Sequence, residues 1–259
     1  MVQSAALAKA KVETPVPDLV VVSGPPAGPA KDRFFVRTAT GLRQDVLQLG
    51  RRVFAATAEA VVALRRHNPL RASTVIAGHN ELEERRLRIE RDCLALLAST
   101  RTLAGERRLV AGLIHIARDF TRIGENAVDI AAVARDLPAA IRAQLPERFW
   151  QLCDEAPALV ACALDSLSAR DAVGARTVCE RAQSMHHLRV LSEAALFILA
   201  NTSADLLPSI FRLSSVVRNV ERIIESASEI ALQAIYLTTG RVERVDPDRE
   251  WASLRFSLN

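Results

Sequence analysis

The amino-acid sequence predicts an all-α protein built as two tandem three-helix bundles, with six long antiparallel helices. The segment 119–131 returns as 219–231 without a gap, so the chain contains an internal repeat with a period of 100 residues. Aromatic residues make up only 4% of the chain, whereas Ala, Leu, Arg and Glu are abundant, and this mixture favours helices over sheets. In both copies apolar residues recur at three- and four-residue spacing, which is the pattern of the buried face of an amphipathic helix.

The two copies share charged as well as apolar positions. The repeated residues of the first copy are Arg118, Arg122, Ile123, Glu125, Ala127, Ile130 and Ala131. Their counterparts are Arg218, Arg222, Ile223, Glu225, Ala227, Ile230 and Ala231. Acidic residues also stand four apart, as Glu125 and Asp129 in the first copy and as Glu221, Glu225 and Glu229 in the second. Because this spacing places them on one helical face, one turn apart, the acidic residues form a ridge on each helix.

The length and composition bound the class of protein. A chain of 259 residues, 49% hydrophobic and 25% charged, is long enough for one large or two small domains with a sizeable core. Lys and Arg number 34 against 30 Asp and Glu, a weak excess that does not indicate nucleic-acid binding. No run of about 18 apolar residues predicts a membrane span, and the N-terminus lacks a secretory pattern. We therefore expect a cytoplasmic location.

The chain divides at compositional boundaries and helix-capping signals. Residues 1–33 are rich in Pro and Gly and are predicted to be disordered. We assign 34–138 to the first bundle, 139–240 to the second and 241–259 to a C-terminal tail in which Trp251 and Phe256 pack back on the bundle. The expected helices are 34–66, 69–99, 106–135, 146–169, 172–200 and 206–238.

Residues with strong conformational preferences justify these boundaries. Asn68, with Pro69 after it, is expected to cap the second helix. Asp171 and Asp205 are expected to cap the fifth and sixth helices. Pro157 is expected to kink the fourth helix or mark its true start. Gly240 is expected to end the sixth helix.

Cysteine and histidine residues do not form a metal-binding pattern. The four cysteines, with no Cys-x-x-C spacing, are interpreted as buried, reduced packing residues: Cys93, Cys153, Cys162 and Cys179. His186 and His187 are adjacent and point about 100° apart on a helix, so they cannot chelate one ion together. His115 is interpreted as an interior or boundary residue.

The segment from Asp119 to Ala131 resembles the signature of the PhoU family of phosphate-signalling proteins, in which each of two repeats carries a motif close to D-L-E-R-I-G-D-x-A-x-x-I-A. The second copy, Val220 to Ala231, is similar, as is the closing segment Ile235 to Gly240. Leu103 to Arg108 resembles the P-V-A-x-D-L-R stretch that opens the family's third helix. The helix predicted over 69–99 is similar in length and apolar positions. The resemblance covers about residues 34 to 240.

The resemblance implies a metal site, because some PhoU proteins bind metal clusters through acidic motifs on their third and sixth helices. Clustered carboxylates suit hard or borderline cations, so iron, zinc or another divalent metal is the expected ion. The candidate ligands are Glu125, Asp129, Glu221, Glu225 and Glu229. The sequence departs from the family at Thr121, where an acidic residue is usual, and this weakens the expectation. Alternatively, the interleaved arginines neutralise these acids as surface ion pairs.

The resemblance also implies a non-enzymatic regulator of phosphate uptake. Such a protein acts between the ATPase of a phosphate ABC importer and a phosphate-sensing histidine kinase, and represses the phosphate-starvation response when phosphate is plentiful. A homodimer is expected, as many family members form. The residues expected to dock on a partner are Arg118, Arg122, Arg218 and Arg222.

Two other functions remain open at this stage. A di-metal carboxylate enzyme is one, although such bundles usually carry Glu-x-x-His on paired helices, which neither signature helix has. The sequence also lacks a Gly-rich phosphate loop, G-x-S-x-G and H-E-x-x-H. A DNA-binding helical regulator is the other, but Glu interrupts the Arg runs and no short basic recognition helix is evident.

Overall fold

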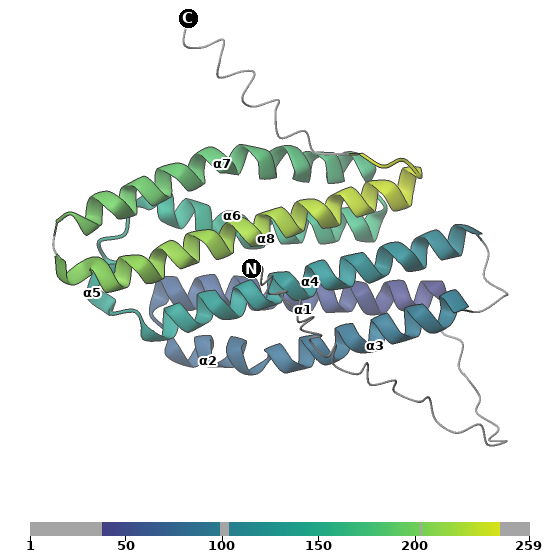
Figure 1. The fold of residues 1–259 in the computed structure, drawn as a ribbon, viewed down its shortest axis with the longest axis horizontal. Helices are drawn as coiled ribbons and strands as arrows, with labels where there is room; N and C mark the ends of the chain where they lie inside the picture. The colour runs from purple at the N-terminus through teal and green to yellow at the C-terminus, as the bar shows by residue number, and fades with distance from the viewer. Residues whose placement is uncertain (1–37, 99–103, 203, 244–259) are drawn as a thin grey trace, which may run out of the picture. The chain divides into compact units, whose positions relative to one another are not determined.

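The computed structural model describes residues 38–98, 104–202 and 204–243. All described regular structure is helical, which confirms the predicted all-α class (Figure 1). The helices of the first half are α1 (Ala39–Arg66), α2 (Pro69–Ala77), α3 (His79–Ala98) and α4 (Ala104–Asp136). The short helix α5 (Ala139–Arg142) then leads to α6 (Glu147–Ala169), α7 (Ala172–Ala200), the 3-10 turn η1 (Ala204–Leu206) and α8 (Leu207–Thr239).

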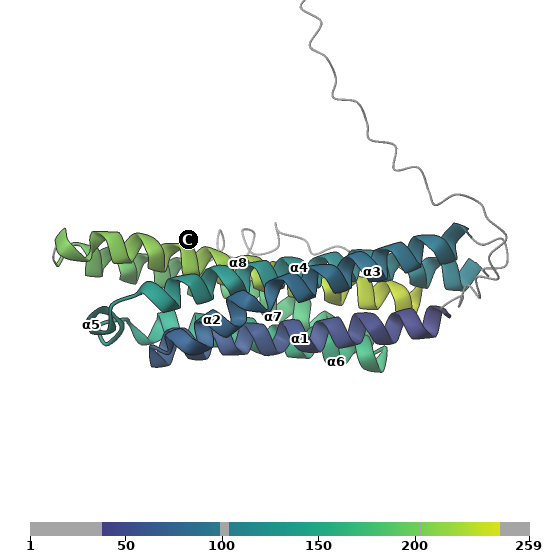
Figure 2. The same cartoon turned by 90° about the horizontal axis from the view of Figure 1, so that it is seen from below.

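The helices of each half pack on one another, and the two halves also meet. In the first half α4 contacts α1, α2 and α3, and in the second α8 contacts α6 and α7. The helix pairs α4–α8 and α1–α6 join the two halves, and the helices of each pair run alongside one another (Figures 1 and 2). All described helices belong to one compact unit. The proposed domain limits at 34–138 and 139–240 therefore stay predictions.

The predicted apolar stripes form the core. In α8 the stripe residues are buried: Val220, Ile223, Ile224, Ala227, Ile230 and Ala231. The first-copy counterparts of five of them are also buried: Phe120, Ile123, Ala127, Ile130 and Ala131. The helical period of the apolar residues thus decides which face of each signature helix turns inward.

Most of the predicted caps are confirmed. The side chain of Asn68 accepts from the backbone N–H of Arg71, and that of Asp171 accepts from Val173 and Gly174. Gly240, with a φ of 74°, ends α8 in the left-handed conformation that glycine adopts without steric cost.

Three helix predictions need correction. The helix expected over 69–99 is divided at Gly78 into α2 and α3, although Gly78 keeps near-helical dihedral angles (φ −73°, ψ −11°). Asp205 does not cap α8, because it lies within η1 and the chain is already helical at Leu206 (φ −80°, ψ −20°). Pro157 lies inside α6, so it does not mark the start of the helix, and the expected kink stays a prediction.

The cysteine prediction holds for three of the four residues. Cys93, Cys153 and Cys179 are buried, and all four cysteines are free. Burial raises the pKa of Cys93 to about 12, so its thiol stays protonated. Cys162 is exposed, contrary to the prediction, because it lies on the outer face of α6. The predictions for residues 1–33 and for Trp251 and Phe256 fall outside the described residues.

In the described part of the chain, no helix has both the length and the apolar character needed to cross a membrane.

Gly50→Ala should lower the free energy of unfolding by about 1–3 kcal/mol, the usual cost of overpacking a core. A Cβ here would lie 2.5 Å from Cζ of Phe120 and 2.8 Å from Cδ1 of Leu164, both buried. This cost exceeds the roughly 0.5–1 kcal/mol that alanine gains over glycine in a helix. Urea denaturation measures the change. In the control variant Gly41→Ala, the nearest atom is Oγ1 of Thr38 at an ordinary 3.5 Å, and equal stability of the two variants would contradict the prediction.

Candidate functional site on α4 and α8

The two signature helices lie against each other, although their repeats are 100 residues apart in sequence. Arg122 of α4 bonds Ser226 of α8, and Gly112 of α4 faces Leu237 of α8, so the two helices run antiparallel. A Cβ on Gly112 would lie 2.8 Å from Cδ2 of Leu237, so the absence of a side chain there permits close packing. The contact therefore brings the two copies of the charged ridge onto neighbouring helices.

Arg122 connects the two signature segments. Its Nε donates to Oγ of Ser226 at 2.9 Å, and its Nη2 donates to Oδ1 of Asp119, also at 2.9 Å. Ser226 in turn donates to the carbonyl of Arg222 at 2.8 Å, and the repeat-related Asn126 donates to the carbonyl of Arg122 at 2.6 Å. The same side-chain-to-backbone bond thus recurs at the same place in both copies.

Asp119 is the most perturbed carboxylate of this region. Burial raises its pKa to about 6; Arg122 opposes the shift, whereas Glu229 of α8 adds to it. The sequence reasoning did not select Asp119 as a site residue. Its signal was nevertheless present, since Asp119 opens the repeat and its counterpart Asn219 is also polar; Asn219 is buried and Asp119 is partly buried.

The five predicted acidic residues are not gathered into one cluster. Glu125, Asp129, Glu225 and Glu229 are exposed on the outer faces of α4 and α8. Glu221 is half-buried and forms an ion pair with Nε of Arg189 at 2.7 Å. Burial raises the pKa of Glu221, and the charge of Arg189 opposes that shift.

The structure explains the departure at Thr121. Its side chain is 3% exposed and its hydroxyl donates to the carbonyl of Ala117 at 3.1 Å, so this position offers no ligand at the surface. Among the residues that the structure describes, no three His, Cys, Asp or Glu side chains lie close enough together to hold a metal ion. The metal site stays a prediction. Protein stripped by a chelator and then exposed to Zn²⁺ or Fe²⁺ tests it directly.

The four predicted docking arginines have different surroundings. Nη2 of Arg118 lies 2.6 Å from Oε1 of Glu90 on α3, which ties α4 to its neighbour. Arg122 is held by Asp119 and Ser226. Arg218 and Arg222 are exposed. The alternative in which these arginines neutralise the predicted acids is not observed among the described residues, because Arg118 and Arg122 pair with carboxylates outside that set and Glu221 pairs with Arg189.

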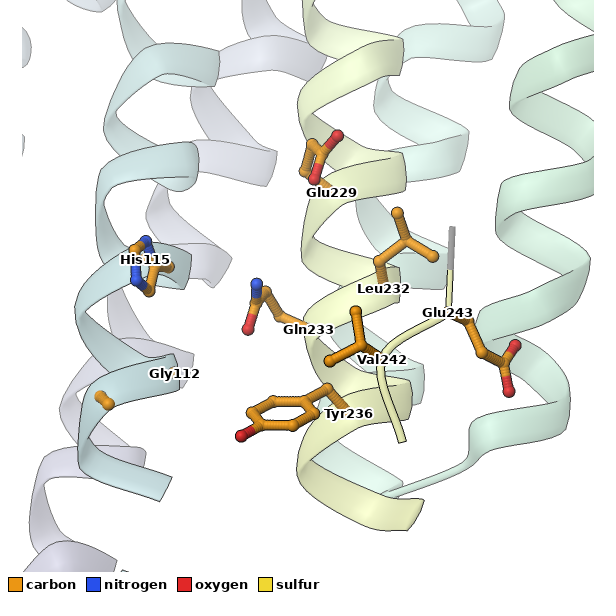
Figure 3. A pocket seen from close by; sticks show the side chains of 9 residues that line it. Gly112, His115, Glu229, Leu232, Gln233, Tyr236, Val242 and Glu243 are labelled. Atoms are coloured by element: carbon orange, nitrogen blue, oxygen red, sulfur yellow. The ribbon is translucent and has the colours of Figure 1, made fainter. Parts of the chain in front are cut away.

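A pocket of about 550 Å³ lies between the two signature helices and the segment that follows α8 (Figure 3). His115 of α4 faces Gln233 and Tyr236 of α8, and Glu229 lies at the same surface. Glu243 binds Arg176 of α7 through two hydrogen bonds of 2.6 and 3.0 Å. His115 is therefore an exposed pocket residue, not an interior one. Of the predicted site residues, the pocket includes only Glu229.

Comparison with known proteins supports the resemblance seen in the sequence. Residues 46–134 match the family model described as the PhoU domain. A phosphate-specific transport system accessory protein PhoU homolog from Clostridium acetobutylicum is 22% identical over 203 residues, covering 77% of this chain and 92% of that protein. The homolog from Aquifex aeolicus is 26% identical over 200 residues, covering 77% and 90%. PhoU homolog 1 from Mycobacterium bovis is 29% identical over 181 residues, covering 65% and 76%.

Solved structures support the fold. PhoU from Pseudomonas aeruginosa superposes with a TM-score of 0.71 at 22% identity, covering 78% of this chain and 97% of that structure. The phosphate transport system regulatory protein PhoU from Streptococcus pneumoniae gives the same TM-score at 20% identity, covering 80% and 97%. The fold thus places the chain in the class of all-α helical-bundle proteins. Residues 46–134 carry a PhoU domain, and most of the chain is similar to curated PhoU homologs.

Asp119→Asn should stabilise the protein at neutral pH and not at pH 4. In the wild type the folded-state pKa of Asp119 is about 6, above the ordinary 3.8, so the folded protein binds the carboxyl proton more tightly than the unfolded chain does. The wild type therefore loses stability as the pH rises from about 4 to above 6. At about 1.4 kcal/mol per pKa unit, the gain at pH 7.5 is at most about 3 kcal/mol. Urea midpoints measured from pH 4 to 8 test this. The exposed Glu125→Gln serves as control, and a pH-independent difference between Asp119→Asn and the wild type would contradict the assignment.

Proposed function

We propose that this chain is a non-enzymatic accessory regulator of a phosphate-specific transport system, acting in the cytoplasm. It would link the ATPase of a phosphate ABC importer to a phosphate-sensing histidine kinase and repress the starvation response when phosphate is plentiful. The names of its relatives support the transport system as the context. The observation that carries the proposal is the juxtaposition of the two signature copies on α4 and α8.

Helix-on-helix docking is the physical basis that we propose for partner binding. Arg218 and Arg222 are exposed on α8, and Glu225 and Glu229 are exposed beside them on the same helix. Charged side chains of both signs at a binding surface contribute more to specificity and association rate than to raw affinity. Arg122 pairs with the largely covered Asp119 and keeps 52% of its own side chain exposed, so it would both position the ridge and face a partner.

The proposed partner of the apolar end of α7 and α8 is a second copy of the chain. Phe197 and Ile198 near the end of α7 are 70% and 68% exposed, and Phe211 in the first turns of α8 is 73% exposed. Large exposed apolar side chains commonly mark protein interfaces. A homodimer formed there would bury them and leave the α4–α8 ridge open to other partners.

The homodimer proposal predicts a concentration-dependent mass in sedimentation equilibrium. The wild-type protein should sediment as a dimer, and the double variant Phe197→Ser, Phe211→Ser should sediment as a monomer, because it removes the central apolar contacts. Leu70→Ser, which changes an 80% exposed side chain on α2, is the matched control and should remain dimeric. A wild-type protein that stays monomeric at high concentration would rule out the dimer.

The regulatory proposal predicts the phenotype of a deletion strain. Without this chain, alkaline phosphatase should be expressed in high phosphate, and the wild-type gene should restore repression. A gene carrying Arg218→Glu and Arg222→Glu should restore it poorly, since reversing two charges at a binding surface should weaken association roughly tenfold. Arg51→Glu with Arg88→Glu, on α1 and α3, is the matched control and should complement fully. A deletion strain that still represses the enzyme in high phosphate, with normal phosphate uptake, would refute the proposal.

A further inference from the structure

A second, smaller pocket lies where four helices end or begin. It has a volume of about 190 Å³ and is lined by the start of α1, the start of α4, the end of α6 and the end of α8. Three of its lining residues are arginines, Arg43, Arg108 and Arg170, and none of the lining residues is acidic. The first pocket differs, because Glu229 and Glu243 line it.

Two of the three arginines, Arg43 and Arg108, are placed by the backbone or by a neighbouring ring. Nη2 of Arg43 donates to the carbonyls of Leu167 and Ser168 at 3.1 and 2.7 Å. Both bonds use one nitrogen of a guanidinium that carries five N–H donors, so donors remain for a ligand. The guanidinium carbon of Arg108 lies 6.0 Å from the centre of the Tyr236 ring. A Cβ on Gly240 would come within 2.9 Å of Nη1 of Arg108, so this side chain rests on the end of α8.

The electrostatics of the pocket favour an anion. Burial lowers the pKa of Arg43, and the like charge of Arg170 adds to this shift. None of the three arginines has a carboxylate within ion-pairing distance among the residues that the structure describes. Gly105, in the first turn of α4, also lines the pocket, and the first-turn N–H groups of a helix favour negative charge. An anion would offset this repulsion and supply acceptors for the unused donors.

The volume restricts the size of the ligand. At about 30 Å³ for each water, 190 Å³ corresponds to roughly six water molecules. One tetrahedral oxyanion with its bridging waters fits this space, whereas a whole nucleotide does not. Planar guanidinium groups match the oxygen pairs of such an anion well.

We propose that the pocket lined by Arg43, Arg108 and Arg170 binds a tetrahedral oxyanion of the phosphate type, either free phosphate or the phosphoryl group of a small molecule. Because the lining residues come from α1 and α4 of the first half and from α6 and α8 of the second, the bound anion holds the two halves together at this end. Binding to the folded state alone stabilises it in proportion to ligand concentration. This site does not depend on the regulatory function, since purified protein is sufficient to test it.

Isothermal titration calorimetry of the full chain with sodium phosphate, at constant ionic strength balanced with chloride, tests the proposal. We expect one phosphate bound per chain, with a melting temperature that rises as phosphate is added. Arg108→Gln should weaken binding at least tenfold. Arg107→Gln is the matched control, because it removes the same charge from the adjacent position outside the pocket lining, and binding should stay within about twofold of wild type.

Parallel titrations with sulfate and with glycerol 3-phosphate distinguish the source of the oxyanion. Equal binding of phosphate and sulfate supports a general oxyanion site, and tighter binding of glycerol 3-phosphate assigns the phosphoryl group of a small molecule. If Arg108→Gln does not fold, Arg170→Asn replaces it, since Asn tolerates the left-handed conformation of Arg170 (φ 56°). No saturable phosphate binding at millimolar concentration, or an equal loss of binding in Arg107→Gln, overturns the proposal.

Discussion

The packing of α4 against α8 is the contact on which the rest of this structure depends. Each of these helices is the centre of its own half, since α4 contacts α1, α2 and α3, and α8 contacts α6 and α7. The close approach at Gly112 and Leu237 brings two apolar stripes face to face, so their burial serves both halves at once. The charged residues on the opposite faces of the same helices then lie on one surface. Core packing therefore determines which charges become neighbours.

Much of the fold could be predicted from the sequence because it follows from local chemistry. The three- and four-residue spacing of apolar positions specified the buried faces, and Asn68, Asp171 and Gly240 marked helix ends through their side-chain or backbone preferences. The failures arose where neighbouring structure overrode a local preference. Asp205 has the right chemistry for a cap, but the 3-10 turn that contains it already has helical dihedral angles and leaves it no capping geometry.

The candidate site was less predictable, since it depends on contacts between helices. The spacing of Glu125, Glu225 and Glu229 placed them correctly on exposed faces, but it could not show that Asp119 is partly buried beside Arg122. The bond between Arg122 and Ser226 joins residues 104 apart, and no local pattern encodes it. The basic pocket is a similar case, because Arg43, Arg108 and Arg170 are far apart in sequence and meet only once the helix ends converge.

The antiparallel packing of α4 on α8 relates the duplicated segments by an approximate two-fold rotation, since Arg122 meets Ser226 and Gly112 meets Leu237. The contact therefore has the symmetry of an isologous dimer interface, but it is formed within one chain. In a true dimer every substitution appears twice, whereas here each copy can change alone. Thr121 has turned inward while its counterpart Glu221 still carries a charge, so the two ends of this surface already differ. A covalently linked pseudo-dimer can thus present a surface with a direction, which an identical pair of subunits cannot.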